Sequence, residues 1–313
     1  LEQRARRVGF GPKKRNILRL VTDEDVEADV LAATHHDPHI STRKISRAST
    51  ISQSSVVRIF QKSKFHAYHV ELHQELRPND FLMRTAFCNW MQGQIQNDPA
   101  FLLKILFTDE ATFHSSGRVN KHNMHYWAEE NPHWMRVVDY QQRWSLNVWC
   151  GIFNNTLIGP YFFDGPLNSQ MYTDFLRETL PGLLEDVPLY DRQNMWMQQD
   201  GAPAHYAVIS REAANEMFPG RWIGRGGSVH WPARSPDLTP LDFFLWGAVK
   251  ERVFSTPPTT PEDMQERIRF ACNSFGEATL LRAQQSLRRR LRICIDQEGG
   301  HFENLLCKRI LWY

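Results

Sequence analysis

The chain has 313 residues, 42% of them hydrophobic, and a formal net charge of +2, which allows one large domain with a small one beside it. No apolar run approaches the roughly 20 residues of a membrane helix, which excludes a membrane span. The five scattered cysteines form no C-x-x-C pair, which excludes a zinc ribbon and a disulfide framework. We expect a soluble, intracellular protein; the start at Leu1 rather than Met is typical of a fragment that lacks upstream sequence.

Positive charge is concentrated in the first part of the chain. Residues 1–70 contain thirteen Lys or Arg against seven Asp or Glu, a balance of +6, whereas the remainder carries −4. No acidic residue lies between Asp37 and Glu71. This one-sided stretch suits a phosphate backbone, and an ordinary solvated basic surface is the alternative.

Residues 21–68 are predicted to form a helix-turn-helix domain. Thr22 to Asp25 opens a first helix as a capping box, and Asp37 followed by Pro38 closes it. Ser41 and Ser52 are each preceded by Ile, which predicts two further capped and stapled helices, the last running to about Lys62. A three-helix unit without a ligand is the alternative. Residues 1–20 read as a basic arm.

The second helix of such a motif enters the major groove, so its exposed N-terminal residues are the candidates for DNA contact. Gln53 and Arg58 can read base edges, whereas the serines and Lys62 suit phosphates. Thr50 occupies the turn position where these motifs often have Gly, so we expect a different turn geometry. The candidate DNA-binding residues are Arg43, Lys44, Gln53, Ser54, Ser55, Arg58 and Lys62.

Three aspartates follow or begin predicted elements in the rest of the chain. The apolar run 101–107 predicts a buried strand that ends at Asp109, and the short apolar segment before Asp200 repeats the pattern. Asp242 falls in the first turn of a helix that follows a proline-rich lead. A single aspartate of this kind is more often a cap or turn residue, but three in phase favour a common site.

The remaining elements predict the fold class. Strands are expected at 145–153 and 157–163, joined by a hairpin turn, and helices at 170–184 and from about 206 to Met217. The predicted fold is a mixed α/β, ribonuclease-H-like catalytic domain over 99–256, preceded by the small all-α domain. Residues 69–98 are expected to be a linker with a possible dimerisation segment, and 257–313 a helical tail.

Phosphodiester chemistry accounts for three such carboxylates. Two Mg²⁺ ions roughly 4 Å apart clamp the attacking and leaving oxygens of an in-line displacement, with Mn²⁺ as a substitute, and both ions prefer carboxylate oxygens. We expect Asp109 to bridge both ions, Asp200 to complete one and Asp242 the other. Water attacks first, and the 3′-hydroxyl that it releases then attacks a second DNA.

Three segments resemble the catalytic blocks of mariner-type transposases: 107–113 (FTDEATF), 199–205 (QDGAPAH) and 235–246 (SPDLTPLDFFLW). The resemblance implies that the third acid is Asp242, while Asp237 is a structural turn or cap residue. The separation 242 − 200 = 42 is longer than in the best-known members, and the surplus falls in 220–228. This loop insertion suggests a longer-spaced branch of the family.

The resemblance also implies an activity and partners. A transposase binds the terminal inverted repeats of its element, cleaves the ends and transfers the 3′-hydroxyl strand into target DNA at TA sites, as a homodimer in the nucleus. No small-molecule substrate is expected. Family members have two helix-turn-helix units joined by a basic linker, which residues 9–15 resemble, and 72–78 resembles a segment used to pair subunits.

Two alternative functions remain open from the sequence. One is a transposase-derived DNA-binding protein that no longer cleaves, and the other is a nuclease of the same fold without strand transfer. His205 is expected to cap a helix or pack, rather than to position phosphate. Glu110 should alternate to the side opposite Asp109. The arginines of the tail either close over DNA or form a solvated face.

Overall fold

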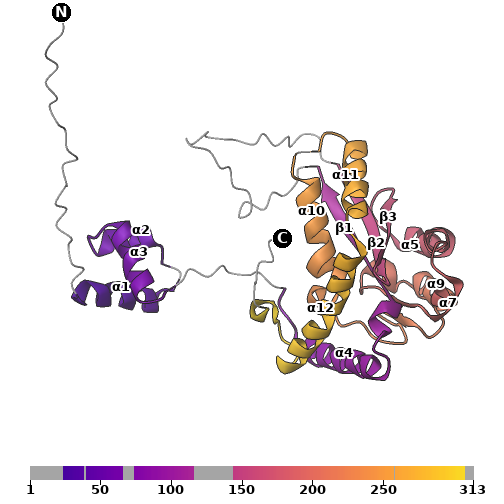
Figure 1. The fold of residues 1–313 in the computed structure, drawn as a ribbon, viewed down its shortest axis with the longest axis horizontal. Coiled ribbons are helices and arrows are strands. Elements are labelled where there is room, and N and C mark those ends of the chain that lie inside the picture. The colour runs from indigo at the N-terminus through magenta and orange to yellow at the C-terminus, as the bar shows by residue number, and fades with distance from the viewer. Residues whose placement is uncertain (1–23, 39, 66–73, 116–143, 257, 307–313) are drawn as a thin grey trace, which may run out of the picture. The chain divides into compact units, whose positions relative to one another are not determined.

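The computed structural model describes residues 24–38, 40–65, 74–115, 144–256 and 258–306, and it divides into a unit within 1–72 and a unit within 73–313. Each unit is described by itself (Figure 1). The predicted basic arm, residues 1–20, lies outside the described residues.

The first unit consists of three short helices, α1 (Glu24–His36), α2 (Thr42–Ala48) and α3 (Gln53–Lys62). The predicted caps are confirmed: Ser41 Oγ accepts from the Lys44 amide, and Ser52 Oγ accepts from the Ser55 amide. The helices bury a small core of Val30, Ile45, Val56 and Ile59. Both predicted stapling isoleucines, Ile40 and Ile51, pack against this core.

The turn between α2 and α3 passes through the left-handed region. Thr50 has φ = 55°, the conformation that Gly usually supplies at this position. The Thr50 hydroxyl donates to the Ser49 carbonyl, and the Ser46 hydroxyl donates to the Ile51 carbonyl at 2.6 Å. The turn therefore keeps the backbone form typical of the motif although its residue is not Gly, and the different geometry expected from the sequence is not found.

The second unit is built on one five-stranded sheet with the strand order β3-β2-β1-β4-β5. Its strands are β1 (Ile105–His114), β2 (Ser145–Phe153), β3 (Thr156–Phe163), β4 (Trp196–Gln198) and β5 (Trp222–Ile223). The first three strands are antiparallel, and β4 and β5 run parallel to β1. The predicted hairpin is confirmed, with Asn154 and Asn155 at positive φ in its turn.

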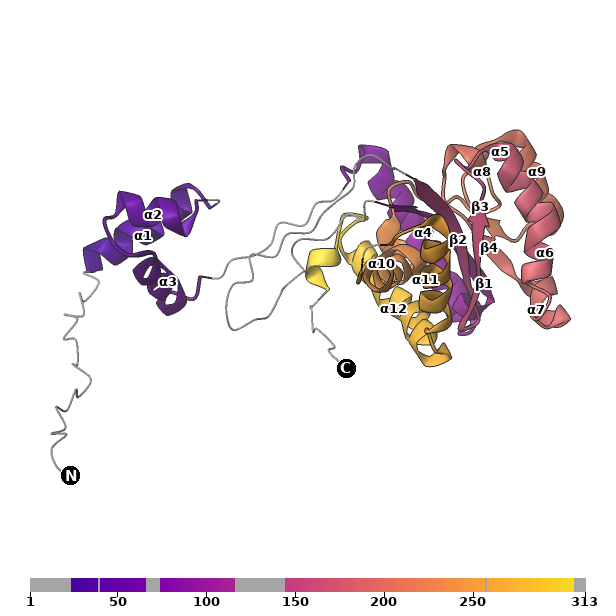
Figure 2. The same cartoon turned by 90° about the horizontal axis from the view of Figure 1, so that it is seen from above.

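Helices cover both faces of the sheet (Figure 2). On one face lie α4 (Pro78–Asn97), α10 (Trp246–Val253), α11 (Pro261–Asn273) and α12 (Glu277–Asp296). On the other lie α5 (Ser169–Asp174), α6 (Leu180–Leu183), α7 (Leu189–Asn194), α8 (Pro203–Tyr206) and α9 (Val208–Met217). Residues 69–98 and 257–313 thus contribute helices to this unit. Among the helices that the structure describes, none has the length and apolar character to cross a membrane.

The two faces of the sheet bury separate cores because strand residues alternate. Leu106 and Trp149 pack in the core under α5 and α9, whereas Phe107 and Cys150 pack in the core under α4, α10 and α12. Trp149 and Trp246 are both buried, as expected for core tryptophans.

The first strand differs from its prediction. Residues Phe101–Lys104 form a short 3₁₀ helix, and β1 then runs on to His114. Asp109 is therefore inside the strand and not at its end. The reason is tertiary: β2 pairs with β1 from Phe107 to His114, which supplies hydrogen bonds that the apolar pattern alone does not reveal.

A buried arginine joins three distant parts of this unit. Arg84 on α4 is 0% exposed, and its guanidinium makes a bidentate ion pair with Asp237, at 2.7 Å and 2.5 Å. It also donates to the Ser235 hydroxyl at 2.9 Å and to the Gly299 carbonyl at 2.6 Å. The pair ties α4 to the lead into Asp242 and to the chain after α12. Asp237 thus has the structural role that the sequence assigned to it.

A second ion pair supports the first. Arg234 bonds Asp80 on α4, and the Asp80 carboxylate also accepts from the Arg77 amide at 2.7 Å. Burial alone would raise the pKa of Asp80, but these bonds lower it. Residues 234–237 are therefore fixed on α4 at two successive points.

Breaking the buried pair should destabilise the protein strongly. Asp237→Asn leaves the Arg84 charge buried without its counter-ion. We therefore expect the free energy of unfolding, measured in urea, to fall by about 3–5 kcal/mol. The control is Arg177→Ala, which removes an arginine from the exposed Arg177–Glu216 pair and should change stability by less than about 1 kcal/mol. Equal losses in the two variants would contradict the role given to Arg84.

Candidate active site

Two of the predicted acids emerge side by side from neighbouring parallel strands. Phe107 on β1 pairs with Gln198, the last residue of β4, and Asp109 and Asp200 each follow that pair by two residues; the charge of Asp200 acts on Asp109. The Thr108 hydroxyl donates to the Gln198 carbonyl at 2.6 Å, which fixes the strands just below the acids. Because β4 ends at Gln198, space beside Asp109 is left for side chains of the following loop.

The third acid, Asp242, comes from the helical layer that contains α10 and not from the sheet. Asp242 lies in a π-helical turn, Leu241–Leu245, that leads directly into α10. Its carboxyl is close enough to that of Asp109 for the two to shift each other's pKa. Asp109 also accepts from the indole Nε1 of the buried Trp246, at 2.7 Å. Single π turns are frequent at functional sites, and this one brings Asp242 to Asp109.

The negative charges in the cluster disfavour ionisation of Asp109 and Asp242. Burial, followed by the charges of Asp242 and Glu110, raises the pKa of Asp109 well above its ordinary value. Burial and the charge of Asp200 raise the pKa of Asp242 to about 6. Carboxylates that are held together at such a cost are typical of sites that bind a cation or move a proton.

Asp200 differs because a histidine holds it. His205 is 2% exposed, and its Nδ1 lies 2.7 Å from Asp200 Oδ1 while its Nε2 lies 3.2 Å from Glu110 Oε2. Burial alone would lower the pKa of His205, but the Glu110 and Asp200 carboxylates raise it to about 10. Burial would raise the pKa of Asp200, but the bond from His205 lowers it. His205 is therefore a cation between two carboxylates.

The structure adds residues that the sequence analysis did not place in the site. Glu110 does project to the face opposite Asp109, as predicted, but there it contacts His205 and so belongs to the same cluster. The Tyr172 ring packs against the His205 ring at a tilt of 40°, with centroids 4.1 Å apart, and its hydroxyl donates to Gln199 Oε1 at 2.6 Å. Lys250, two turns after Asp242, lowers the pKa of that acid. No sequence signal marked Tyr172 or Lys250.

The donor set fits hard divalent cations, since carboxylate oxygens are their usual ligands. In the described part of the chain, no three His, Cys, Asp or Glu side chains are arranged around one point that could hold a metal ion. The negative charges of Asp242 and Asp200 both act on Asp109, so the three acids lie within electrostatic reach of one another.

The predicted DNA-contacting residues lie in the other unit. Arg43, Lys44, Gln53, Ser54, Arg58 and Lys62 are exposed, and Ser55 is half-buried. Two of them already have partners: Lys62 pairs with Glu27 on α1 at 2.8 Å, and Gln53 donates to Thr42 at 2.9 Å. Among the described residues, no such side-chain contact is found for Arg58 on α3 or for the exposed cations of α2, which are Arg43, Lys44 and Arg47.

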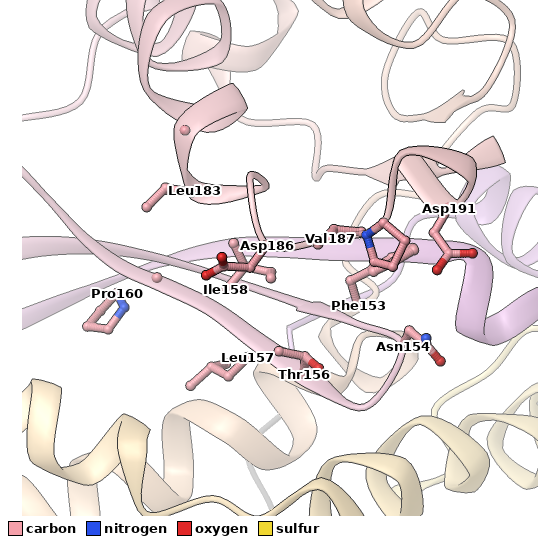
Figure 3. Close-up of a pocket in the computed structure, with 13 residues that line it drawn as sticks. Phe153, Asn154, Thr156, Leu157, Ile158, Pro160, Leu183, Asp186, Val187 and Asp191 are labelled. Carbon is pink, nitrogen blue, oxygen red and sulfur yellow. The ribbon is translucent and has the colours of Figure 1, made fainter. Parts of the chain in front are cut away.

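A cavity of about 470 Å³ lies elsewhere in the second unit, between the β2–β3 hairpin and the segment around α6 and α7 (Figure 3). Phe153, Ile158, Leu183 and Val187 line it, with Asp186 at its edge. None of the three aspartates is among its lining residues. We therefore assign the candidate site to the carboxylate cluster, where the charges and the buried histidine are.

Comparison with known proteins supports both the fold and the family resemblance. The chain is similar to the Tc3 transposase of Caenorhabditis elegans, at 24% identity over 301 residues, which cover 94% of this chain and 85% of that protein. No protein-family model matches it.

Solved structures of the Mos1 transposase have the same fold. The paired-end complex with the left transposon end matches with a TM-score of 0.71 at 18% identity, covering 88% of this chain and 80% of that one. The match to the paired-end complex with Mg covers 97% of this chain and 84% of that one, with a TM-score of 0.68 at 18% identity. The match to the isolated catalytic domain covers 74% of this chain and 100% of that one, with a TM-score of 0.58 at 17% identity. The predicted ribonuclease-H-like α/β domain with a helical N-terminal domain is confirmed.

The charged His205 should make stability depend on pH. Its pKa rises from 6.5 to about 10 on folding, so the stabilisation is complete below pH 6.5 and is lost as the pH rises toward 10, by at most about 1.4 kcal/mol per pH unit. Unfolding in urea with a chelator present, compared with His205→Asn, isolates this contribution. A stability difference that stays constant between pH 6.5 and 10 would refute it.

Proposed function

We propose that this chain, whose sequence and fold are those of a mariner-type transposase, cuts DNA at the ends of a transposable element and joins the freed strand to a target. The observation that carries the proposal is the position of Asp109 on β1 beside the end of the parallel strand β4, which Asp200 follows by two residues, with the charges of Asp200 and Asp242 both acting on Asp109. The likeness to Tc3 transposase over nearly the whole chain supports the same reaction.

Metal binding would fall to the three aspartates. Asp109 would hold two ions, Asp200 one of them and Asp242 the other; solved structures of Mos1 transposase include paired-end complexes with Mg and with Mn. Two divalent ions would supply activation of the attacking hydroxyl and stabilisation of the leaving oxygen. They would also offset the mutual repulsion of the carboxylates, which explains why these acids are gathered in one place.

The chain's own residues would keep the site in shape. His205 fixes the rotamer of Asp200 by its Nδ1 contact, and the Trp246 indole fixes Asp109. Oriented carboxylates present their oxygens in a constant geometry, which is what an in-line displacement requires. The pair of Arg84 and Asp237 positions the segment from which Asp242 projects.

Recognition of the element would fall to the helical unit. Its third helix, α3, presents Arg58 to solvent with Gln53 at its start, in the place where the second helix of a helix-turn-helix reads base edges. Two copies of the chain would hold the two ends; a solved structure of Mos1 transposase is a paired-end complex with the left transposon end. The reaction would take place on chromosomal DNA in the nucleus.

Removing one acid should abolish cleavage. With Mg²⁺ and DNA that carries the element's ends, Asp200→Ala should cut at least about a hundredfold more slowly than the unaltered chain, and a chelator should stop both. Asp164→Ala, a change of an exposed aspartate on the loop after β3, is the matched control. Equal cutting by Asp200→Ala would refute the carboxylate site, and cutting without any joined product would favour a nuclease.

Recognition can be tested separately from cutting. Arg58→Ala should weaken binding to the element's end by about 1–3 kcal/mol and relax the preference for one base pair, because it removes a base-edge contact. Lys44→Ala should instead weaken binding to matched and scrambled DNA alike, as loss of a phosphate contact does. Binding isotherms on the two DNAs check this; the same loss for Arg58→Ala on both would contradict its assignment.

A further inference from the structure

Segment 220–228, to which the sequence analysis assigned the additional spacing, consists of β5 and a compact, hydrogen-bonded loop after it. The Gly224 amide donates to the Val229 carbonyl at 3.0 Å, and the Gly227 amide donates to the Gly224 carbonyl at 3.1 Å. The Ser228 hydroxyl is within 3.0 Å of the carbonyls of both Gly220 and Trp222. Segment 220–228 therefore contains β5, which pairs with β4, and the residues after Ile223 form a defined loop.

Two glycines let this loop lie flat on Trp222. A Cβ at position 224 or 227 would come within 2.8 Å of the indole or the backbone of Trp222, closer than real contacts allow. Gly226 has φ = 86° and turns the chain, so that Arg225 is presented outward at the tip. The loop thus has the geometry of a support for one exposed arginine.

Arg225 is directed over the residues that follow Asp200. Its guanidinium carbon lies 3.9 Å from the ring centroid of Tyr206, which is 39% exposed, and its side chain faces the position of Gly201. Arg211 on α9 lies over the same ring at 5.0 Å. Tyr206, which is adjacent in sequence to His205, therefore contacts two guanidinium groups beside the carboxylate cluster.

Neither arginine has its charge balanced by a protein group. Among the described residues, no carboxylate forms an ion pair with Arg211 or Arg225. The Arg211 Nε atom is buried and has no hydrogen-bond partner. A buried donor without an acceptor costs free energy, so two unpaired guanidiniums in contact with one ring indicate a site that an anion completes.

From these contacts we infer that Arg211, Arg225 and Tyr206 form a phosphate clamp for the DNA strand that is being cut. A guanidinium group binds phosphate oxygens through pairs of N–H donors. Contact with the Tyr206 ring holds both guanidinium groups in place before the phosphate binds. The clamp lies against Gly201, the residue after Asp200, so the phosphate that it holds is close to the one attacked. This inference rests on the proposed function and gives the inserted loop a role in it.

The test measures DNA cleavage and DNA binding by the full chain. Arg225→Ala and Arg211→Ala should each raise the DNA concentration for half-maximal cleavage about tenfold, with the maximal rate changed less than about twofold, and lower the salt dependence of binding by about one counter-ion. Tyr206→Ala should resemble them, whereas Tyr206→Phe, which keeps the ring, should behave like the unaltered chain. Arg177→Ala, the loss of an arginine that is paired with Glu216, should change neither quantity.

The results that would contradict the phosphate clamp differ from those that would contradict the proposed function. Equal effects of Arg225→Ala and Arg177→Ala would overturn the clamp, as would an effect on joining to the target without one on cleavage. Binding is measured with the metal ions removed, so the clamp is tested even where the chain cuts nothing. Absence of cleavage by the unaltered chain contradicts the proposed function; a salt dependence that Arg225→Ala leaves unchanged contradicts the clamp.

Discussion

The buried guanidinium of Arg84 is the constraint on which the catalytic unit depends. A charge without water is tolerated only when it is paired and hydrogen-bonded, and here Asp237, Ser235 and Gly299 provide the partners. These partners lie more than 150 residues after Arg84 in the sequence. Satisfying one side chain therefore brings together the helix before the sheet, the lead into Asp242 and the end of the chain after α12.

The carboxylate cluster is stable for a different reason. Burial and the charge of Asp242 raise the pKa of Asp109, and burial and the charge of Asp200 raise the pKa of Asp242; the Trp246 indole and Lys250 offset these shifts only in part. On the other side, His205 carries the positive charge between Asp200 and Glu110. One flank of the site is thus balanced internally, while the flank of Asp109 and Asp242 is left for cations, in keeping with the proposed two-ion chemistry.

Local patterns predicted the elements well because their causes are local. Ser41 and Ser52 cap helices through amides three residues away, and the turn after Phe153 needs only its own two asparagines. The extent of β1 was not predictable in this way, since it depends on pairing with β2 about 40 residues later. The roles of Glu110 and Lys250 likewise depend on partners from other layers.

The sequence by itself determined the α/β fold class, the two kinds of domain and three aspartates in a recognisable order, because apolar periodicity, caps and motif spacing are written along the chain. Only the tertiary structure decided which groups meet. The parallel register of β1 and β4 makes Asp109 and Asp200 neighbours, and the fold of 220–228 stacks Arg225 on Tyr206. Such contacts follow from strand pairing and burial between distant segments, which no local pattern specifies.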